Sequence, residues 1–212
     1  IGYGSCGQGI AMRAKGLGAN VIVCEVDPLR ALEAVMDGFT VLPGIEAAAR
    51  ADVIVTATGN RDAVAGAMFD VMGDGTIVCN AGHFDIEINK IELIDRAHER
   101  AEVRPLVERY TLAGGRRIYL LAEGRLVNLS AAEGHPPAVM DMSFAHQALA
   151  VEHLVRQAGK LAPRVYPVPD GADEQIARLK LESLRVSIDE LTTAQKNYLT
   201  SWDTPSKGTE QR

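Results

Sequence analysis

Three absences narrow what this sequence can be. It contains no run of about 18 apolar residues, the length that a helix needs to span a bilayer. Lys and Arg number 22 against 28 Asp and Glu, and the net charge of -6 argues against a surface for nucleic acid or anionic lipid. The three cysteines form no CxxC pair, which fits a reducing compartment and gives no structural zinc site. We expect a soluble, cytoplasmic protein with small-molecule partners and no metal, nucleic-acid or membrane contact.

The start of the chain is also unusual. It has no initiator Met and no signal peptide, and a glycine-rich loop begins at its second residue. The 212 residues leave room for one large or two small domains, at roughly 150 residues per domain.

Apolar, β-branched runs alternate with helical stretches over the first part of the chain. Strands are predicted at 21–26, 52–59 and 75–82, with a minor strand at 39–42. Helices are predicted at 28–38, where Pro28 opens the first turn, and at 62–72. This alternation is typical of βαβ units, so we expect an α/β fold with a doubly wound parallel sheet.

The pattern changes after residue 103. Gly114 and Gly115 separate two extended stretches, which predicts a hairpin-like segment near the sheet edge. A well-buried helix is expected at 138–157, and three prolines between 163 and 169 indicate an extended connector. Further helices are expected at 173–184 and from Thr192, which has capping-box spacing to Gln195.

The opening loop carries the first chemical signal. Gly2, Gly4 and Gly7 spell G-x-G-x-x-G before a helical pattern, and the following strand ends at Glu25. In a Rossmann-type fold such a loop binds a pyrophosphate on backbone N–H groups, and the acid binds the adenosine ribose and repels a 2′-phosphate. The context favours a dinucleotide-binding loop over a merely flexible one, and it favours NAD over NADP as the ligand. The strand that should precede the loop is represented by Ile1 alone.

Polar residues follow the next two predicted strands. They are Thr56, Thr58, Gly59 and Asn60 after one strand, and the run from Asn80 to His83 after the next. Carboxyl ends of parallel strands face the ligand crevice, although ordinary turn chemistry explains these residues equally well.

The five histidines divide into two groups. His83 and His135 lie beside glycines in loops, where either could be an acid, a base or a ribose ligand. His98 is expected in a charged, solvated helix, and His146 and His153 in the long helix as surface or satisfied core residues. Met140, Met142 and Phe144 are most simply core residues, although a base-binding pocket would use them too.

Several motifs together resemble one family. GYGSCGQG, VTATGN, NAGHFDIEI, LAEGRLVNLSAAEGHP and YPVP before a helical tail are similar to S-adenosylhomocysteine hydrolases across essentially the whole chain. The resemblance implies reversible cleavage of S-adenosylhomocysteine to adenosine and homocysteine. It also implies a tightly held NAD that oxidises the ribose 3′-hydroxyl, acidifies the 4′ proton and later reduces the ketone again.

The same resemblance implies roles for individual residues. His83 and His135 match catalytic positions, and His135, Met140 and Phe144 match the part that closes over adenosine. The cofactor would be bound by Gly2, Gly4, Ser5, Cys6, Gly7, Gln8, Gly9, Glu25, Thr58, Asn60, Ala81, Gly82, His83, Asn128 and, from a neighbouring subunit of a homotetramer, Tyr198.

The chain departs from the family pattern in two places. Many members carry a Lys four positions before the tail tyrosine, where this sequence has Ala194 with Lys196 nearby. The family's substrate domain, with its principal catalytic residues, precedes the glycine loop. We therefore interpret 1–135 as an NAD-binding domain, 136–162 as a helix returning to that substrate domain and 163–212 as a connector and tail. Such a portion alone is expected to bind NAD poorly and to be inactive.

Three alternatives stay open from the sequence. A 2-hydroxyacid dehydrogenase shares the fold but would show an Arg and a Glu-then-His pair that NAGHF and GHP do not provide. A non-catalytic, hydrolase-like regulatory module would not need both His83 and His135. An inosyl substrate could replace the adenosyl one, because the residues that select adenine fall mostly outside this sequence.

Overall fold

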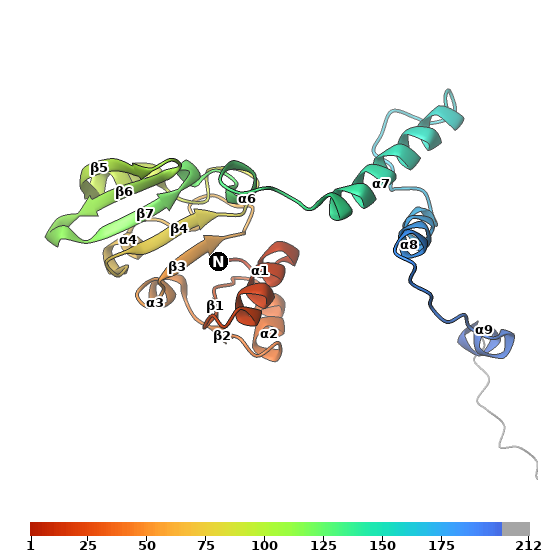
Figure 1. The fold of residues 1–212 in the computed structure, drawn as a ribbon, viewed down its shortest axis with the longest axis horizontal. Helices are drawn as coiled ribbons and strands as arrows, with labels where there is room; N and C mark the ends of the chain where they lie inside the picture. The colour runs from red at the N-terminus through yellow and green to blue at the C-terminus, as the bar shows by residue number, and fades with distance from the viewer. Residues whose placement is uncertain (201–212) are drawn as a thin grey trace, which may run out of the picture. The chain divides into compact units, whose positions relative to one another are not determined.

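The computed structural model describes residues 1–200, which divide into two compact units, 1–135 and 136 onwards (Figure 1). The first unit contains α1 (Ser5–Gly16), β1 (Ile22–Val23), α2 (Pro28–Met36), β2 (Thr40–Val41), α3 (Gly44–Ala48), β3 (Val53–Thr56), α4 (Ala67–Val71), β4 (Thr76–Asn80), α5 (Lys90–Arg96), β5 (Ala97–Arg104), β6 (Val107–Leu112), β7 (Arg117–Leu121) and α6 (Val127–Ser130). The second contains α7 (Pro137–Arg156), α8 (Ala172–Ser183) and α9 (Thr193–Thr200).

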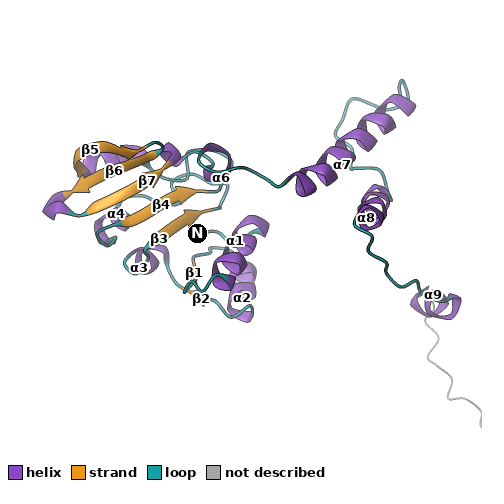
Figure 2. Cartoon of the chain, in the orientation of Figure 1, coloured by secondary structure: helices purple, strands orange, loops and turns teal. Residues whose placement is uncertain are grey.

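The first unit is an α/β fold with two groups of strands (Figure 2). β1 and β2 pair in parallel, and a five-stranded sheet has the order β3-β4-β7-β6-β5. β3, β4 and β7 are mutually parallel, whereas β6 and β5 run antiparallel to their neighbours. The expected parallel sheet is therefore confirmed for its central strands, and the predicted hairpin is β6–β7, with β5 rather than β7 at the edge.

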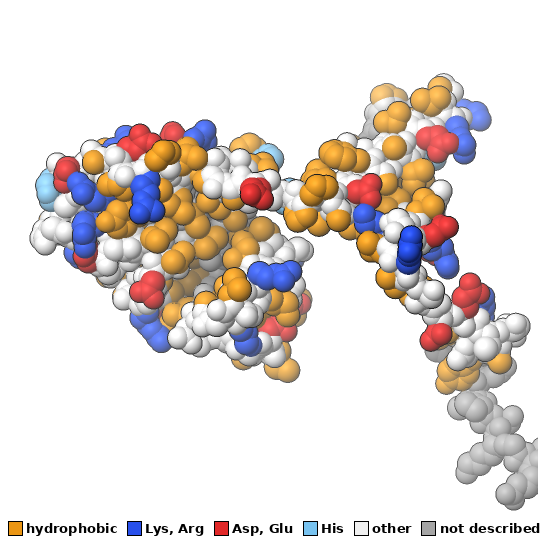
Figure 3. Space-filling view, in the orientation of Figure 1, with side chains coloured by type: hydrophobic (Ala, Val, Ile, Leu, Met, Phe, Trp, Pro, Cys, Tyr) orange, Lys and Arg blue, Asp and Glu red, His pale blue; other side chains and the backbone are white. Residues whose placement is uncertain are grey.

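The glycine loop joins the two groups of strands. Gly2 N donates to Cys24 O after β1, and Ala57 N after β3 donates to Ile1 O, both at 2.8 Å. Beyond these two residues the facing edges of β1 and β3 are separated by a groove of about 810 Å³ lined by Val21–Val23 and Val53–Val55. Figure 3 shows apolar side chains gathered in this hollow. Ile1 thus lies between the ends of β1 and β3, where the sequence predicts the strand that precedes the glycine loop.

Two apolar clusters hold the unit together. The larger one packs side chains of α3, α4 and α5 against one face of the five-stranded sheet, with Phe69, Val78, Leu93, Ile118 and Leu120 fully buried. The smaller one packs Tyr3, Ala11 of α1 and Ala34 of α2 around Val23 and Phe39. Burial of this kind contributes roughly 25 cal/mol per Å² of apolar surface, which makes the two clusters the main stabilising contacts of the strands that carry the site.

Local sequence signals explain several helix boundaries. Asp27 caps α2 by accepting hydrogen bonds from Leu29 N and Arg30 N, and Pro28 occupies the first turn, where its missing N–H costs nothing. Thr192 and Gln195 exchange the hydrogen bonds of a capping box at the start of α9. The helices predicted at 28–38, 138–157 and 173–184 and from Thr192 are confirmed.

Three expectations about helices are wrong. The helix predicted at 62–72 shrinks to α4, because Asp62 has a φ of +53° and Val64 bridges Ile88 instead. His98 lies in β5 and not in a helix, since α5 ends at Arg96 and the chain then pairs with β6. The helix at 138–157 is expected to be well buried, but no side chain of α7 is buried among the described residues. Within its own unit α7 has mainly α8 to pack on.

Candidate functional site

The glycine loop has the close approaches that its motif requires. Gly2 has a φ of +93°, and a Cβ there would lie 2.7 Å from Ala57 O. A Cβ on Gly7 would lie 1.9 Å from Gly2 O, whereas a Cβ on Gly4 would meet no protein atom within 4 Å. The first and third glycines are therefore fixed by contacts within the protein, and the second leaves open space through which a ligand can approach the backbone.

The loop leads directly into the N-terminus of α1. Gly4 is its N-cap, no side chain caps the helix, and the first turn contains no acidic residue. The first helical hydrogen bond runs from Gln8 N to Gly4 O at 2.8 Å. The preceding N–H groups of Ser5, Cys6 and Gly7 are therefore available to an anion, and the helix dipole favours negative charge at this end.

Glu25 stands at the end of β1, beside the loop. Its Oε2 accepts from Tyr3 N at 2.6 Å, and its Oε1 accepts from Val26 N at 2.6 Å and Asp27 N at 3.0 Å. Partial burial alone would raise the pKa of Glu25, but these three donors outweigh it and lower the pKa below its ordinary value. The carboxylate stays ionised and keeps acceptor capacity for a ribose hydroxyl.

Tyr3 ties the loop to α2 from the other side. The side chain is 1% exposed, and its hydroxyl donates to Asp37 Oδ2 at 2.7 Å. Burial and this hydrogen bond raise the pKa of Tyr3 to about 12, so the phenol stays protonated. The loop is thereby anchored to both the acid and the end of α2.

Asn80, at the end of β4, organises the loop that carries His83. Its Oδ1 accepts from Thr56 Oγ1 at 2.9 Å and from Gly82 N at 2.7 Å. Its Nδ2 donates to the carbonyls of Phe84 at 2.9 Å and Gly124 at 3.0 Å. The side chain is fully buried and joins the ends of β3 and β4 to the turn after β7. We infer that Asn80 serves the site as a positioning residue.

Glu87 makes the second link between these loops, and sequence reasoning missed it. The residue is 1% exposed. Its Oε2 accepts from Thr58 N at 2.9 Å and Thr58 Oγ1 at 2.7 Å, and its Oε1 accepts from Gly59 N at 2.8 Å. A Cβ on Gly82 would lie 1.6 Å from Oε1, so any side chain there would displace the carboxylate from its donors. The signal available in the sequence was a Glu inside the otherwise apolar pair Ile86 and Ile88.

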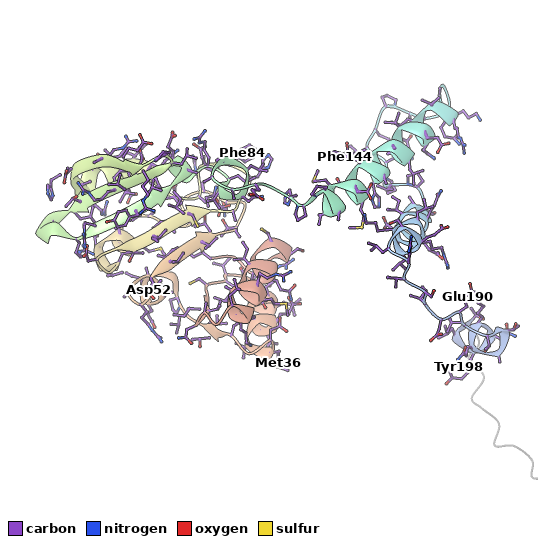
Figure 4. The ribbon with its side chains drawn as sticks, viewed as in Figure 1. Met36, Asp52, Phe84, Phe144, Glu190 and Tyr198 are labelled. Carbon is purple, nitrogen blue, oxygen red and sulfur yellow. The ribbon has the colours of Figure 1, made fainter. Side chains whose placement is uncertain are left out.

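The structure brings most predicted cofactor residues to one end of the first unit. The Cys6 thiol approaches Ala81 O at 3.9 Å, which joins the glycine loop to the loop after β4. A cavity of about 650 Å³ is lined by Gly2, Gly4, Glu25, Thr58 and Asn60. His83 is exposed and packs edge-to-face on Phe84, with ring centroids 4.5 Å apart; Figure 4 shows Phe84 on this side of the unit.

The remaining predicted residues are placed separately. Asn128 lies in α6, and His135 is an exposed residue at the end of the first unit. Met140 and Phe144 lie in α7, and Tyr198 lies in α9; Phe144 and Tyr198 are exposed (Figure 4). These three residues belong to the second unit, so their roles at the cofactor or substrate stay predictions.

These residues fit a dinucleotide. The open space at Gly4, the uncapped start of α1 and the ionised Glu25 suit a pyrophosphate and a ribose hydroxyl. Asn128 Oδ1 is buried and has no hydrogen-bond partner within the described residues, so it offers an acceptor for a carboxamide N–H. Within residues 1–200, no group of three potential metal ligands and no helix long and apolar enough to cross a membrane is present.

Comparison with known proteins agrees with this geometry. The family model described as S-adenosyl-L-homocysteine hydrolase, NAD binding domain, matches residues 1–134. Adenosylhomocysteinases of Gloeothece citriformis and Nostoc sp. are 59% and 56% identical, each over 95% of this chain and 47% and 48% of the relative. S-inosyl-L-homocysteine hydrolase of Methanopyrus kandleri is 52% identical over 96% of this chain and 48% of the relative.

The chain thus spans about half the length of the curated relatives it matches. The match to the family model covers the glycine loop, Glu25 and both strand-end loops, and it removes the 2-hydroxyacid dehydrogenase alternative. The chain belongs to the S-adenosyl-L-homocysteine hydrolase family and carries its NAD-binding domain.

Proposed function

We propose that the protein carrying this chain reversibly hydrolyses S-adenosyl-L-homocysteine to adenosine and homocysteine, with NAD as a resident cofactor. The observation that supports this most is the identity of 56–59% to adenosylhomocysteinases over 95% of the chain. When bound, NAD supplies transient oxidation of the ribose 3′-hydroxyl, which acidifies the neighbouring 4′ C–H.

The described residues supply binding and orientation in this scheme. The free N–H groups of Ser5, Cys6 and Gly7 receive the pyrophosphate, and Glu25 accepts from the ribose. Asn80 and Glu87 fix the backbone of the loops on either side of Gly82. His83 follows this fixed segment directly and is exposed, so its ring can exchange a proton with the reacting part of the substrate. His135, Met140 and Phe144 close over adenosine in this proposal.

The base carried by the substrate is a separate question. The Methanopyrus kandleri relative is named for S-inosyl-L-homocysteine, and its identity of 52% is close to that of the adenosyl enzymes. We therefore keep S-inosyl-L-homocysteine as the second candidate substrate.

We further propose a cytoplasmic homotetramer in the methyl cycle. The thiols of Cys6, Cys24 and Cys79 are all free, as in a reducing compartment. Tyr198 is 60% exposed and so is open to a neighbouring subunit's NAD site. Mass photometry of the purified protein tests the assembly; a monomer at micromolar concentration would contradict it.

The activity is tested with the full-length protein that carries this sequence. The protein is loaded with NAD and supplied separately with S-adenosyl- and S-inosyl-L-homocysteine, and the free thiol released is measured with a chromogenic disulfide reagent. We expect thiol release from the adenosyl substrate. Thiol release from the inosyl substrate alone would show that the substrate carries hypoxanthine and not adenine. Bound NAD without thiol release from either substrate would favour the non-catalytic module.

A further inference from the structure

The cavity beside Glu25 holds positive charge that the assigned cofactor does not require. It is lined by the glycine loop, by Glu25, by Arg30 in the first turn of α2 and by Arg61 after β3. In this fold the adenosine ribose lies next to the acid that ends the second strand. Both arginines therefore line the cavity in which the ribose 2′ position is expected.

The two arginines differ in what they pair with. Arg61 Nε lies 3.8 Å from Asp62 Oδ2. Arg30 is exposed and makes no ion pair within 4.0 Å in the described part of the chain; its Nη1 donates to Tyr3 O at 3.4 Å. Tyr3 in turn donates through its own backbone N–H to Glu25 Oε2 at 2.6 Å. Glu25 thus accepts from the backbone N–H of Tyr3, and Arg30 donates to its backbone carbonyl. The two residues carry opposite charges and line the same cavity.

These two charges have opposite effects on a phosphate at the ribose 2′ position. The ionised Glu25 repels it, and three backbone donors hold that carboxylate in place. A guanidinium with free N–H groups binds phosphate through two parallel hydrogen bonds, and an Arg near the ribose is the group that accommodates NADP in this fold.

We propose that Arg30 is a second specificity residue of the cofactor site, which accepts the 2′-phosphate of NADP once the charge of Glu25 is removed. Glu25 is then the group that excludes NADP, since Asp27, the second carboxylate that lines the cavity, is engaged by Leu29 N and Arg30 N as the cap of α2. In the unmodified protein Arg30 partly offsets that exclusion, so the preference for NAD is smaller than the carboxylate alone would give. The inference rests on the cofactor site of the family and is independent of which homocysteine conjugate is hydrolysed.

The test measures cofactor binding and needs no catalysis. Full-length protein is stripped of cofactor, and dissociation constants for NAD and NADP are measured by isothermal titration calorimetry. The proteins compared are the unmodified one, E25Q, R30Q, the double variant E25Q/R30Q and R13Q. R13Q is the matched control, because Arg13 is an exposed arginine of α1 that does not line this cavity.

We expect E25Q to bind NADP at least about tenfold more tightly than the unmodified protein. The double variant E25Q/R30Q should lose most of that gain in NADP affinity, because a hydrogen bond from a charged group to the phosphate is then absent. R30Q alone should weaken NADP binding and leave NAD binding within about threefold of the unmodified protein. R13Q should change neither affinity by more than about threefold. NADP binding to E25Q should weaken with added salt more than NAD binding does.

Two results would overturn the inference. One is NADP binding to E25Q that R30Q leaves unchanged. The other is an equal loss of NAD and NADP in R30Q, which would make Arg30 an adenosine contact. Circular dichroism of each variant identifies a folding defect. Should the protein bind both dinucleotides as expected and yet hydrolyse neither substrate, the proposed function fails and this inference stands.

Discussion

Replacing Glu87 by Gln is expected to weaken both the folding of the first unit and its binding of NAD. The carboxylate is 1% exposed, and its three partners are all donors: Thr58 N, Thr58 Oγ1 and Gly59 N. A Gln side chain has one acceptor oxygen. If that oxygen stays with Thr58, the new NH₂ group faces the N–H of Gly59, donor against donor.

The cost follows from those contacts. A hydrogen bond to a charged group contributes about 1.5–3 kcal/mol, and an unsatisfied buried donor costs a further 1–3 kcal/mol. Removing the buried charge recovers part of this, because a neutral amide is cheaper to bury than a carboxylate. We expect a net loss of about 2 kcal/mol in the free energy of unfolding, which for a unit of this size lowers the melting temperature by roughly 7 °C.

Urea denaturation followed by circular dichroism measures the loss, and calorimetric titration measures NAD. NAD affinity should fall because Thr58 and Asn60 line the cavity and the segment that carries them loses contacts to residue 87. Thr58→Val removes the hydrogen bond from Oγ1 to Glu87 and the one from Asn60 N to Oγ1. Since the first of these is also weakened in E87Q, the double variant should lose less than the sum of the single variants. Glu46→Gln, in the first turn of α3, is the surface control. Unchanged stability and NAD affinity in E87Q would refute the role of Glu87.

Three further predictions use other contacts. Gly7→Ala should lower NAD affinity at least about tenfold, because the new Cβ would lie 1.9 Å from Gly2 O. Gly16→Ala should leave NAD affinity unchanged, because a Cβ there would meet no atom within 4 Å; titration calorimetry measures both variants. Asp27→Ala should cost about 1 kcal/mol in urea denaturation by removing the cap of α2; an unchanged midpoint would contradict this. Hydrogen bonds to Asp173 and to the backbone carbonyl of Met142 raise the pKa of His146. The stabilising contact between protonated His146 and Asp173 should therefore be complete below pH about 6.5 and lost as pH rises through the raised pKa. NMR titration of His146 in Asp173→Asn should show a lower pKa than in the unmodified protein.

The parts of the site that the sequence predicts are those set by short-range chemistry. The spacing of Gly2, Gly4 and Gly7 fixes a turn, a close approach and a helix start within a few residues. Asp27 caps α2 through neighbours two and three residues away. Such signals need no knowledge of distant contacts, because the chain geometry over one turn already determines them.

The contacts that sequence reasoning missed depend on partners far along the chain. Glu87 binds a loop 28 and 29 residues earlier, and Asn80 reaches a carbonyl 44 residues later. Asp62 and Val64 fit a helical pattern, yet their backbone N–H groups donate to the carbonyls of Ile86 and Glu87, which holds this segment out of a helix. Periodicity cannot reveal that competition, since the backbone partner is supplied by another part of the fold.

The net charge of the chain bears directly on how its site holds an anion. A chain with 28 acidic and 22 basic residues would be a poor phosphate binder if it relied on clustered cations. Here the groups offered to the pyrophosphate are neutral N–H donors at the start of α1, and both carboxylates of the site are satisfied by backbone and hydroxyl donors. Counterion release is then small, so NAD affinity should change little between low and moderate salt. A steep loss of NAD affinity with salt would mean that side-chain cations such as Arg30 carry the pyrophosphate, and would contradict the assignment of the helix terminus.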